Sequence, residues 1–370
     1  MIPLFIEHYG NASSIHSVGT EAKNVLEAAR TKLAMFLGAK PGEIIFTSGG
    51  TESNNFALKG IAYANRQKGK NIITSRIEHD SILNPCRWLE KQGFEVNYLP
   101  VDNEGFINIE DLRKSIRNDT ILVSIIHANN EIGTIEPIEE IGKLCRERNI
   151  PFHTDACQSF TKVPLNVRRQ PIDLMTINAH KIYGPKGIGA LFIKEGTTIS
   201  PWQHGGGHER GLRSSTENIP GVIGFAKAAE LGIEEFEQET RRLTYLRDKI
   251  ITTIEKNIET SYLNGPKKNR VCNNVNVGFH GLEGEAVKLL VELDERGIIV
   301  STGSACSSNE GENKPSHVLN AIGLNQVEAR GALRVTLGRY NTEEDVEYFL
   351  AQLPEAMQSL TSIFSISRRR

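Results

Sequence analysis

The sequence lacks the features that mark secreted, membrane-spanning and nucleic-acid-binding proteins. It has only 5 cysteines among 370 residues, an odd number with no C-x-x-C pair. That count argues against a disulfide framework or a zinc site and favours a reducing compartment. The longest aliphatic run, from Ile121 to Ile126, is too short to cross a bilayer. Because the first residues contain no basic and apolar leader, we expect a soluble, cytoplasmic protein.

The sequence also has no large excess of positive or negative charge. Lys and Arg number 43 and Asp and Glu 45, which gives a formal net charge of −2. No global field therefore attracts nucleic acid or a membrane surface, and we expect neither as a direct partner. The length of 370 residues is enough for two domains with a large buried core.

Short β-rich runs alternate with helical stretches through the first two thirds of the chain. Apolar residues recur at helical spacing over 21–37. The expected strands are 43–47, 71–75, 95–100, 120–128, 151–156, 174–178 and 190–193. Several are apolar on both faces, as in a sheet covered by helices on each side. This alternation predicts an α/β fold with a mostly parallel, seven-stranded sheet.

The pattern changes near residue 231, where a long helical period begins. Strands are expected at 274–279, 297–301 and 333–337, and a helix at 283–296. Thr342 with Asp345 three residues later forms a capping-box start for the last helix. We therefore expect a large domain over 10–234 and a smaller α+β domain over 235–370. Residues 1–9 are expected to belong to the smaller domain.

Lys181 lies between two apolar runs, 172–177 and 189–193, so we expect it on a short turn between two strands. A lysine amine can form a Schiff base with a carbonyl cofactor. The earlier strand 151–156 ends with Asp155, whose carboxylate can pair with the pyridinium nitrogen of pyridoxal phosphate. Gln158 would then face the phenolic oxygen. This combination suggests a pyridoxal phosphate enzyme.

The segment 47–54 contains two glycines, follows a strand and opens a helix. Backbone amides at Gly50 and the hydroxyl of Thr51 predict a site for the cofactor phosphate. An ordinary helix cap after a turn is the alternative. The segment is not a Walker A loop, because it lacks the GK[ST] ending.

Three more polar residues follow strands, and each has a plain structural alternative. His79 could stack on the cofactor and relay protons, or be a hydrogen-bonded surface residue. His180 could bind phosphate or only position the lysine turn. Asn129 could bind cofactor or substrate, because ligands sit at the carboxyl ends of strands, or could form a turn before Gly133.

Two loops are rich in glycine and polar residues. The first, 205–218, predicts an ordered loop at an active site or subunit interface; its His208 and Glu209 do not fit an H-E-x-x-H metal motif. The second, 301–313, carries Cys306 and predicts a mobile, exposed loop in which a thiol can be reactive. Arg334, on a predicted strand, could bind a substrate carboxylate or form an internal ion pair.

Together these segments resemble the cysteine desulfurases of the iron–sulfur-assembly and nitrogen-fixation type. Three specific matches carry the resemblance: His180-Lys181 with the glycines after it, Gly303-Ser304-Ala305-Cys306, and Gly207-His208-Glu209-Arg210. The resemblance implies a fold type I pyridoxal phosphate enzyme that forms a homodimer. It implies L-cysteine as substrate, alanine as product, and transfer of sulfur through a persulfide to an acceptor such as an iron–sulfur scaffold.

The resemblance also assigns roles to matching residues. Lys181 would carry the cofactor, Cys306 would receive the sulfur, and Asn129 with Arg334 would bind the substrate carboxylate. The expected cofactor contacts are Gly50, Thr51, His79, Asn129, Asp155, Gln158, Asn178, His180, Lys181 and, from the partner subunit, Thr216. Asn178 departs from the family, where a phosphate-binding serine is usual. A related lyase, such as a selenocysteine lyase, and an inactive homologue acting as a scaffold or sulfur relay stay open as alternatives.

Overall fold

The structure is a computed structural model that describes residues 1–302 and 315–367. Cys306 and most of its loop lie outside the described residues. The chain packs as two units, each with its own core: unit 1 comprises residues 1–100, 107–128 and 136–236, and unit 2 comprises residues 101–106, 129–135 and 237–370. Residues 1–9, which we expected with the second domain, pack with unit 1 instead. Two short inserts, 101–106 and 129–135, belong to unit 2.

Unit 1 is built on a seven-stranded sheet with the order β1-β7-β6-β5-β4-β2-β3. Its strands are β1 (Ile44–Thr47), β2 (Asn71–Ser75), β3 (Glu95–Leu99), β4 (Thr120–Ile126), β5 (Phe152–Asp155), β6 (Leu174–Asn178) and β7 (Gly189–Ile193). The neighbours from β3 to β6 pair in parallel, whereas β7 is antiparallel to both β6 and β1. The predicted mostly parallel sheet is confirmed.

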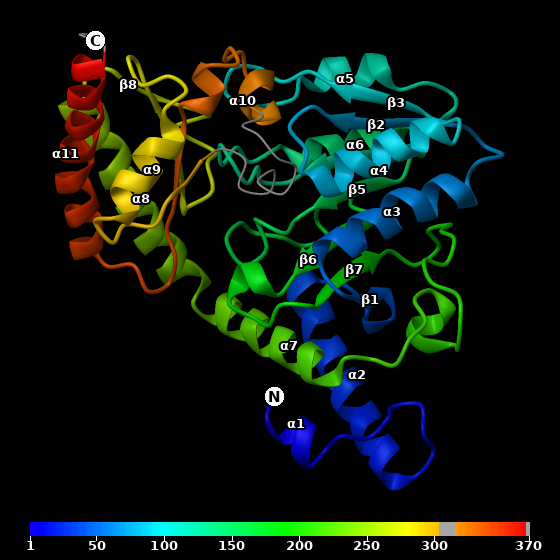
Figure 1. Cartoon of the computed structure of the whole chain (residues 1–370). Coiled ribbons are helices and arrows are strands. Elements are labelled where there is room, and N and C mark those ends of the chain that lie inside the picture. Colours follow the sequence, from blue (N-terminus) through cyan, green and yellow to red (C-terminus); the bar gives the residue numbers. More distant parts are fainter. Residues whose placement is uncertain (303–314, 368–370) are drawn as a thin grey trace. The chain divides into compact units, whose positions relative to one another are not determined.

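Helices bury the faces of this sheet, as the doubly apolar strands require. The helices α3 (Gly50–Ala64) and α4 (Asp80–Lys91) run along one face (Figure 1). There Phe56 and Ile61 of α3 and Ile82 of α4 share a core with Ile72 and Leu122 of the sheet. The remaining helices of unit 1 are α1 (Pro3–Ile6), α2 (Ser17–Leu37), α5 (Ile109–Ser115), α6 (Ile138–Glu147) and α7 (Ile219–Glu234).

Because β7 is the one strand that runs against its neighbours, β1, β2, β4, β5 and β6 all end at the same edge of the sheet. The segments that follow these strands contain most of the polar residues singled out from the sequence. They include the glycine turn before α3, His79, Asp155 and the turn that holds Lys181. The topology thus gathers residues that are up to about a hundred and thirty positions apart in the chain.

Unit 2 has a four-stranded sheet of order β10-β11-β9-β8. Its strands are β8 (Ser261–Leu263), β9 (Asn274–Phe279), β10 (Ser301–Thr302) and β11 (Leu333–Thr336), and its helices are α8 (Phe236–Asn257), α9 (Ala286–Asp294), α10 (His317–Ala321) and α11 (Glu343–Ser367). The capping box holds: Thr342 N–H donates to Asp345 at 3.0 Å and Asp345 N–H donates to Thr342 at 3.2 Å.

Two sequence expectations for unit 2 are wrong. The strand expected at 297–301 is reduced to the two residues of β10, because Gly297 has a φ of +75° and closes the turn after α9 through a hydrogen bond to Asp294. The short edge strand β8 was not anticipated, since three residues give no periodic signal.

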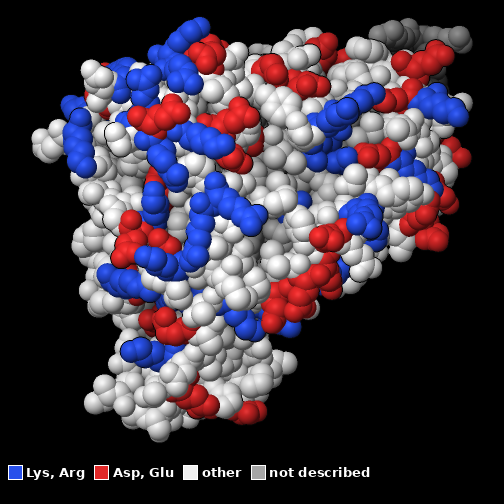
Figure 2. Space-filling view, turned by 180° about the vertical axis from the view of Figure 1, so that it is seen from behind, with Lys and Arg blue, Asp and Glu red and all other residues white. Residues whose placement is uncertain are grey.

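The surface carries both signs of charge. Figure 2 shows Lys and Arg side chains interspersed with Asp and Glu, in keeping with the net charge of −2. Among the helices of the described residues, none combines the length and the apolar character that a membrane crossing demands.

Candidate active site

The turn between β6 and β7 presents Lys181. A single 3-10 turn, His180–Ile182, follows β6 and is closed by Tyr183 at a φ of +66°. The Lys181 backbone N–H donates to Asn178 Oδ1 at 3.4 Å, and its carbonyl accepts from Lys162 Nζ at 3.2 Å. The side chain of Lys181 is exposed at the edge of the sheet, so its amine can reach a ligand there.

The carboxyl group of Asp155 is buried, with 5% of the residue exposed. Its Oδ1 accepts from Cys157 N–H at 2.9 Å and its Oδ2 accepts from Asn54 Nδ2 at 2.7 Å. Each oxygen of the buried carboxyl group therefore has a hydrogen-bond donor. Burial is the main cause that raises the pKa of the Cys157 thiol well above its usual range, and the charge of Asp155 adds to it. The charge of Lys181 acts in the opposite direction and lowers this pKa. Lys181 and Asp155 therefore act on the same half-buried thiol.

The turn before α3 forms a cradle of backbone groups. Gly49 has a φ of +153°, and α3 begins at Gly50 with no side-chain cap. A Cβ atom on Gly50 would lie 2.6 Å from Cys157 Sγ and 3.3 Å from Asn178 Nδ2, so only glycine fits. The side-chain amide of Asn178 thus lies against the first turn of α3, a 15-residue helix with no side-chain cap. Such a helix N-terminus binds anions.

His79 lies at the same edge as the N-cap of α4 and is half-buried. It connects to Asp155 through two residues to which the sequence analysis gave no role, Asn54 and Ser81. Asn54 lies in the segment 47–54, and the signal for it is a polar residue on the buried face of a helix. Burial also raises the pKa of the neighbouring Glu78 to about 8, with Asp155 adding to the effect.

The glycine-rich loop is ordered and fastened to unit 1. Glu209, at a φ of +45°, makes a buried double ion pair with Arg30 at 2.7 and 2.8 Å and accepts from Phe46 N–H of β1 at 2.8 Å. Arg213 binds Glu52 of α3 at 2.8 Å. Thr216, which follows these anchors in the chain, is exposed. It therefore has no buried role within its own unit.

Unit 2 contains Asn129 and Arg334. The Asn129 side chain closes a turn, since its Oδ1 accepts from the N–H groups of Glu131 at 2.8 Å and Ile132 at 3.0 Å. Arg334 donates through Nη1 to Asn130 O at 3.3 Å and through Nη2 to Ser301 Oγ at 3.2 Å. Its Nε–H is buried and has no partner within the described part of the chain. The Asn129 side-chain oxygen therefore closes the turn before Gly133, and Arg334 keeps one donor for a ligand.

Comparison with known proteins gives a consistent result. The sequence pattern of the class-V aminotransferases matches residues 1–349. The cysteine desulfurase IscS of Dictyoglomus turgidum is 54% identical over 98% of this chain and 91% of its own length.

The chain belongs to the cysteine desulfurase family of class-V aminotransferases.

Solved structures agree with this assignment. A NifS-like protein superposes on the desulfurase with a TM-score of 0.89 at 39% identity, covering 96% of this chain and 94% of its own. A structure described as SspA in complex with cysteine has a TM-score of 0.79 at 38% identity, covering 92% of this chain and 94% of its own. The desulfurase therefore has the fold of type I pyridoxal phosphate enzymes.

Pyridoxal phosphate is the cofactor of this family, and the residues of the desulfurase fit it. The exposed amine of Lys181 suits the aldehyde, the buried Asp155 carboxylate suits the ring nitrogen, and the cradle at Gly50 suits the phosphate. Burial and the charges of Lys181 and Lys186 lower the pKa of His180, which favours the neutral imidazole, and its ring N–H can donate to a phosphate oxygen.

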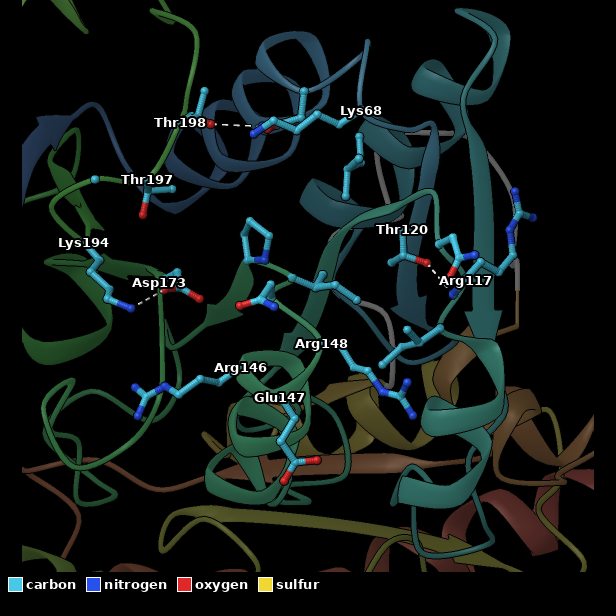
Figure 3. Close-up of a pocket in the computed structure, with 18 of the residues that line it drawn as sticks. Lys68, Arg117, Thr120, Arg146, Glu147, Arg148, Asp173, Lys194, Thr197 and Thr198 are labelled. Atoms are coloured by element: carbon cyan, nitrogen blue, oxygen red, sulfur yellow. Dashed lines mark hydrogen bonds and ion pairs between the residues drawn. The ribbon is translucent and has the colours of Figure 1, made fainter.

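A separate cavity of about 940 Å³ lies at the opposite edge of the same sheet. Figure 3 shows Arg146, Arg148 and Lys194 around it, near the amino ends of β5 and β6. Lys194 is paired with Asp173 at 2.8 Å. The residues of the lysine turn do not line this cavity, so it is distinct from the candidate active site.

Proposed function

We propose that this desulfurase converts L-cysteine to L-alanine and passes the sulfur, as a persulfide on Cys306, to an acceptor protein. The acceptor would serve iron–sulfur cluster assembly or the thiolation of a cofactor or nucleic acid. The observation that carries the proposal is the buried Asp155 carboxylate, held by two donors at the same edge of the sheet as the exposed Lys181. The relatives named cysteine desulfurase support the choice of substrate.

The residues that would hold the cofactor come from four strand ends and one loop of unit 1. The proposed contacts are Gly50, Thr51, His79, Asp155, Gln158, Asn178, His180 and Lys181, with Thr216 supplied by the partner subunit. Asn178 is suited to its place because its Oδ1 is occupied by the Lys181 N–H. Its Nδ2 is then turned to donate toward the α3 cradle, where the family usually has a serine.

Pyridoxal phosphate, when bound, supplies an electron sink for the carbon chemistry of the substrate. Asp155 would keep the ring nitrogen protonated, and the Lys181 amine would carry the Cα proton of cysteine. In unit 2, Arg334 and Asn129 would bind the substrate carboxylate. The Arg334 Nε–H, which has no partner among the described residues, supports that role.

Sulfur transfer would require Cys306 as a thiolate. Its attack on the cysteine sulfur forms the S–S bond while the Cβ–S bond breaks, and Cβ takes up a proton to leave alanine. An unperturbed thiol with a pKa near ~8.5 is only a few per cent ionised at pH 7, so a nearby base should assist. Cys306 lies outside the described residues, and its role is inferred from the Gly303-Ser304-Ala305-Cys306 motif.

We further propose a cytoplasmic homodimer. Large apolar side chains of the first residues are exposed in the single chain, with Ile2 72%, Phe5 64% and Ile15 fully exposed. A second copy that covered them would remove apolar surface from water. The exposed Thr216, on a loop that is otherwise fastened to the chain, is available to a partner subunit.

Turnover of L-cysteine tests the proposal. The wild-type protein should release alanine and gain one sulfur atom on the peptide that contains Cys306, read by mass spectrometry without reductant. Cys306→Ser should keep the cofactor absorbance and lose the persulfide, whereas Lys181→Ala should lose both. Alanine release from selenocysteine but not from cysteine would favour a selenocysteine lyase. Bound cofactor with no turnover of either would favour a scaffold.

A further inference from the structure

Four residues of unit 1 form a continuous hydrogen-bonded chain from Asp155 to His79. Asn54 Nδ2 lies 2.7 Å from Asp155 Oδ2 and 2.8 Å from Ser81 Oγ. Ser81 Oγ lies 2.8 Å from His79 Nδ1. Asn54 is fully buried and Ser81 is 7% exposed, so the connecting bonds are shielded from water.

The chemistry of Asp155 fixes the direction of the first two bonds. An ionised carboxylate only accepts hydrogen bonds, so the Asn54 atom beside it must be the NH₂ group. The same nitrogen has a second hydrogen, and Ser81 Oγ lies within its reach. The Ser81 hydroxyl therefore accepts from Asn54, and its own hydrogen is available for His79 Nδ1.

A second donor reaches the same ring nitrogen. His79 is the N-cap of α4, and its Nδ1 accepts from the Ser81 backbone N–H at 3.0 Å. A nitrogen that accepts from a hydroxyl and from an amide carries no hydrogen itself. In a neutral imidazole, the proton must then be on Nε2.

We propose that Asn54 and Ser81 are positioning residues that hold neutral His79 as the Nε2–H tautomer. The far side of the ring then offers a hydrogen-bond donor instead of a proton acceptor. His79 would stabilise negative charge on the cofactor or substrate, and a different group would serve as the base that ionises the thiol. This functional consequence depends on the proposed function, whereas the tautomer does not.

Nitrogen NMR of the holoenzyme with ¹⁵N-labelled histidine reads the tautomer directly. The His79 signals are identified by their loss in His79→Asn. The proposal predicts an Nδ1 resonance typical of an unprotonated ring nitrogen and an Nε2 resonance typical of a protonated one. A ring found mainly as the Nδ1–H tautomer, or as an equal mixture of the two, would overturn it.

The hydrogen-bonded chain Asp155–Asn54–Ser81–His79 forms a relay. Two variants and one control distinguish this relay from a simple helix cap. Ser81→Ala removes the hydroxyl but keeps the backbone N–H, and Asn54→Ala removes the donor that directs the hydroxyl hydrogen toward His79. Each loses one hydrogen bond that favours the Nε2–H form, so the fraction of the Nδ1–H form should rise about two- to tenfold. The control, Asn55→Ala, loses only a bond to Thr51 O within the same helix and should leave the tautomer unchanged.

The outcomes are distinguishable from a failure of the proposed function. If both variants keep the wild-type tautomer ratio, the relay is refuted, whatever their activity. If the wild-type holoenzyme shows the predicted tautomer but does not turn over cysteine, the relay stands and the proposed function fails. Should Asn54→Ala not fold, Ser81→Ala alone decides the matter.

Discussion

The buried ion pair between Arg30 and Glu209 makes a quantitative prediction about how the glycine-rich loop is held. Both side chains are nearly inaccessible, at 4% and 3% exposure, and they are joined at 2.7 and 2.8 Å. Glu209 also accepts from Phe46 N–H at 2.8 Å. Replacement by glutamine leaves the buried Arg30 charge without the Glu209 counter-charge, which costs about 3–5 kcal/mol. We expect the lower end, because Arg30 keeps Ile44 O and Glu27 as partners.

Urea unfolding of Glu209→Gln followed by far-UV circular dichroism measures this loss against the wild type. The double variant Arg30→Met with Glu209→Leu should recover most of it, since an apolar pair of similar volume replaces two desolvated charges. Lys40→Ala, which removes the exposed pair with Glu195, is the control and should change stability by less than about 1 kcal/mol. If the double variant is no more stable than Glu209→Gln, the reasoning about a coupled buried pair is refuted.

Three further predictions concern the active-site edge. Gly50→Ala places a Cβ 2.6 Å from Cys157 Sγ and should weaken pyridoxal phosphate binding roughly tenfold by equilibrium dialysis; Gly42→Ala, with its nearest neighbour at 3.8 Å, should bind normally. The Glu78 carboxyl binds a proton more tightly in the folded protein, where its pKa is about 8. Its contribution to the free energy of unfolding is therefore lost as pH rises from about 4.3 through 8. Glu78→Gln should therefore gain stability relative to the wild type between pH 5 and 8 in urea titrations, and a gain that does not change with pH would contradict this. Arg334→Lys should raise the KM for cysteine roughly tenfold and leave the cofactor absorbance unchanged; an unchanged KM would remove Arg334 from the substrate site.

The sequence was informative wherever periodicity or a strand end determined the structure. The strands 71–75, 174–178 and 274–279 occur with the expected bounds, because apolar β-branched runs bordered by polar residues are unambiguous. The Lys181 turn was predictable for the same reason. The expected strand at 297–301 failed because the backbone conformation of Gly297, which ends the preceding turn, is not visible in composition.

Contacts between distant segments were beyond sequence reasoning. Nothing in the order of residues indicates that Asn54 reaches Asp155, 101 positions away, or that Arg30 meets Glu209, 179 positions away. Such pairs depend on which strands become neighbours. A buried polar residue on an otherwise apolar helix face, as at Asn54, is the one local signal that could have pointed to the network.

The attachment point of the cofactor tests the central claim most directly. Borohydride reduction of the purified holoenzyme, followed by peptide mass mapping, fixes the pyridoxyl group on the lysine that carries it. The account predicts a single modified peptide with the group on Lys181. Modification of Lys162 or Lys186 instead, or of no lysine in a protein that binds the cofactor, would contradict it.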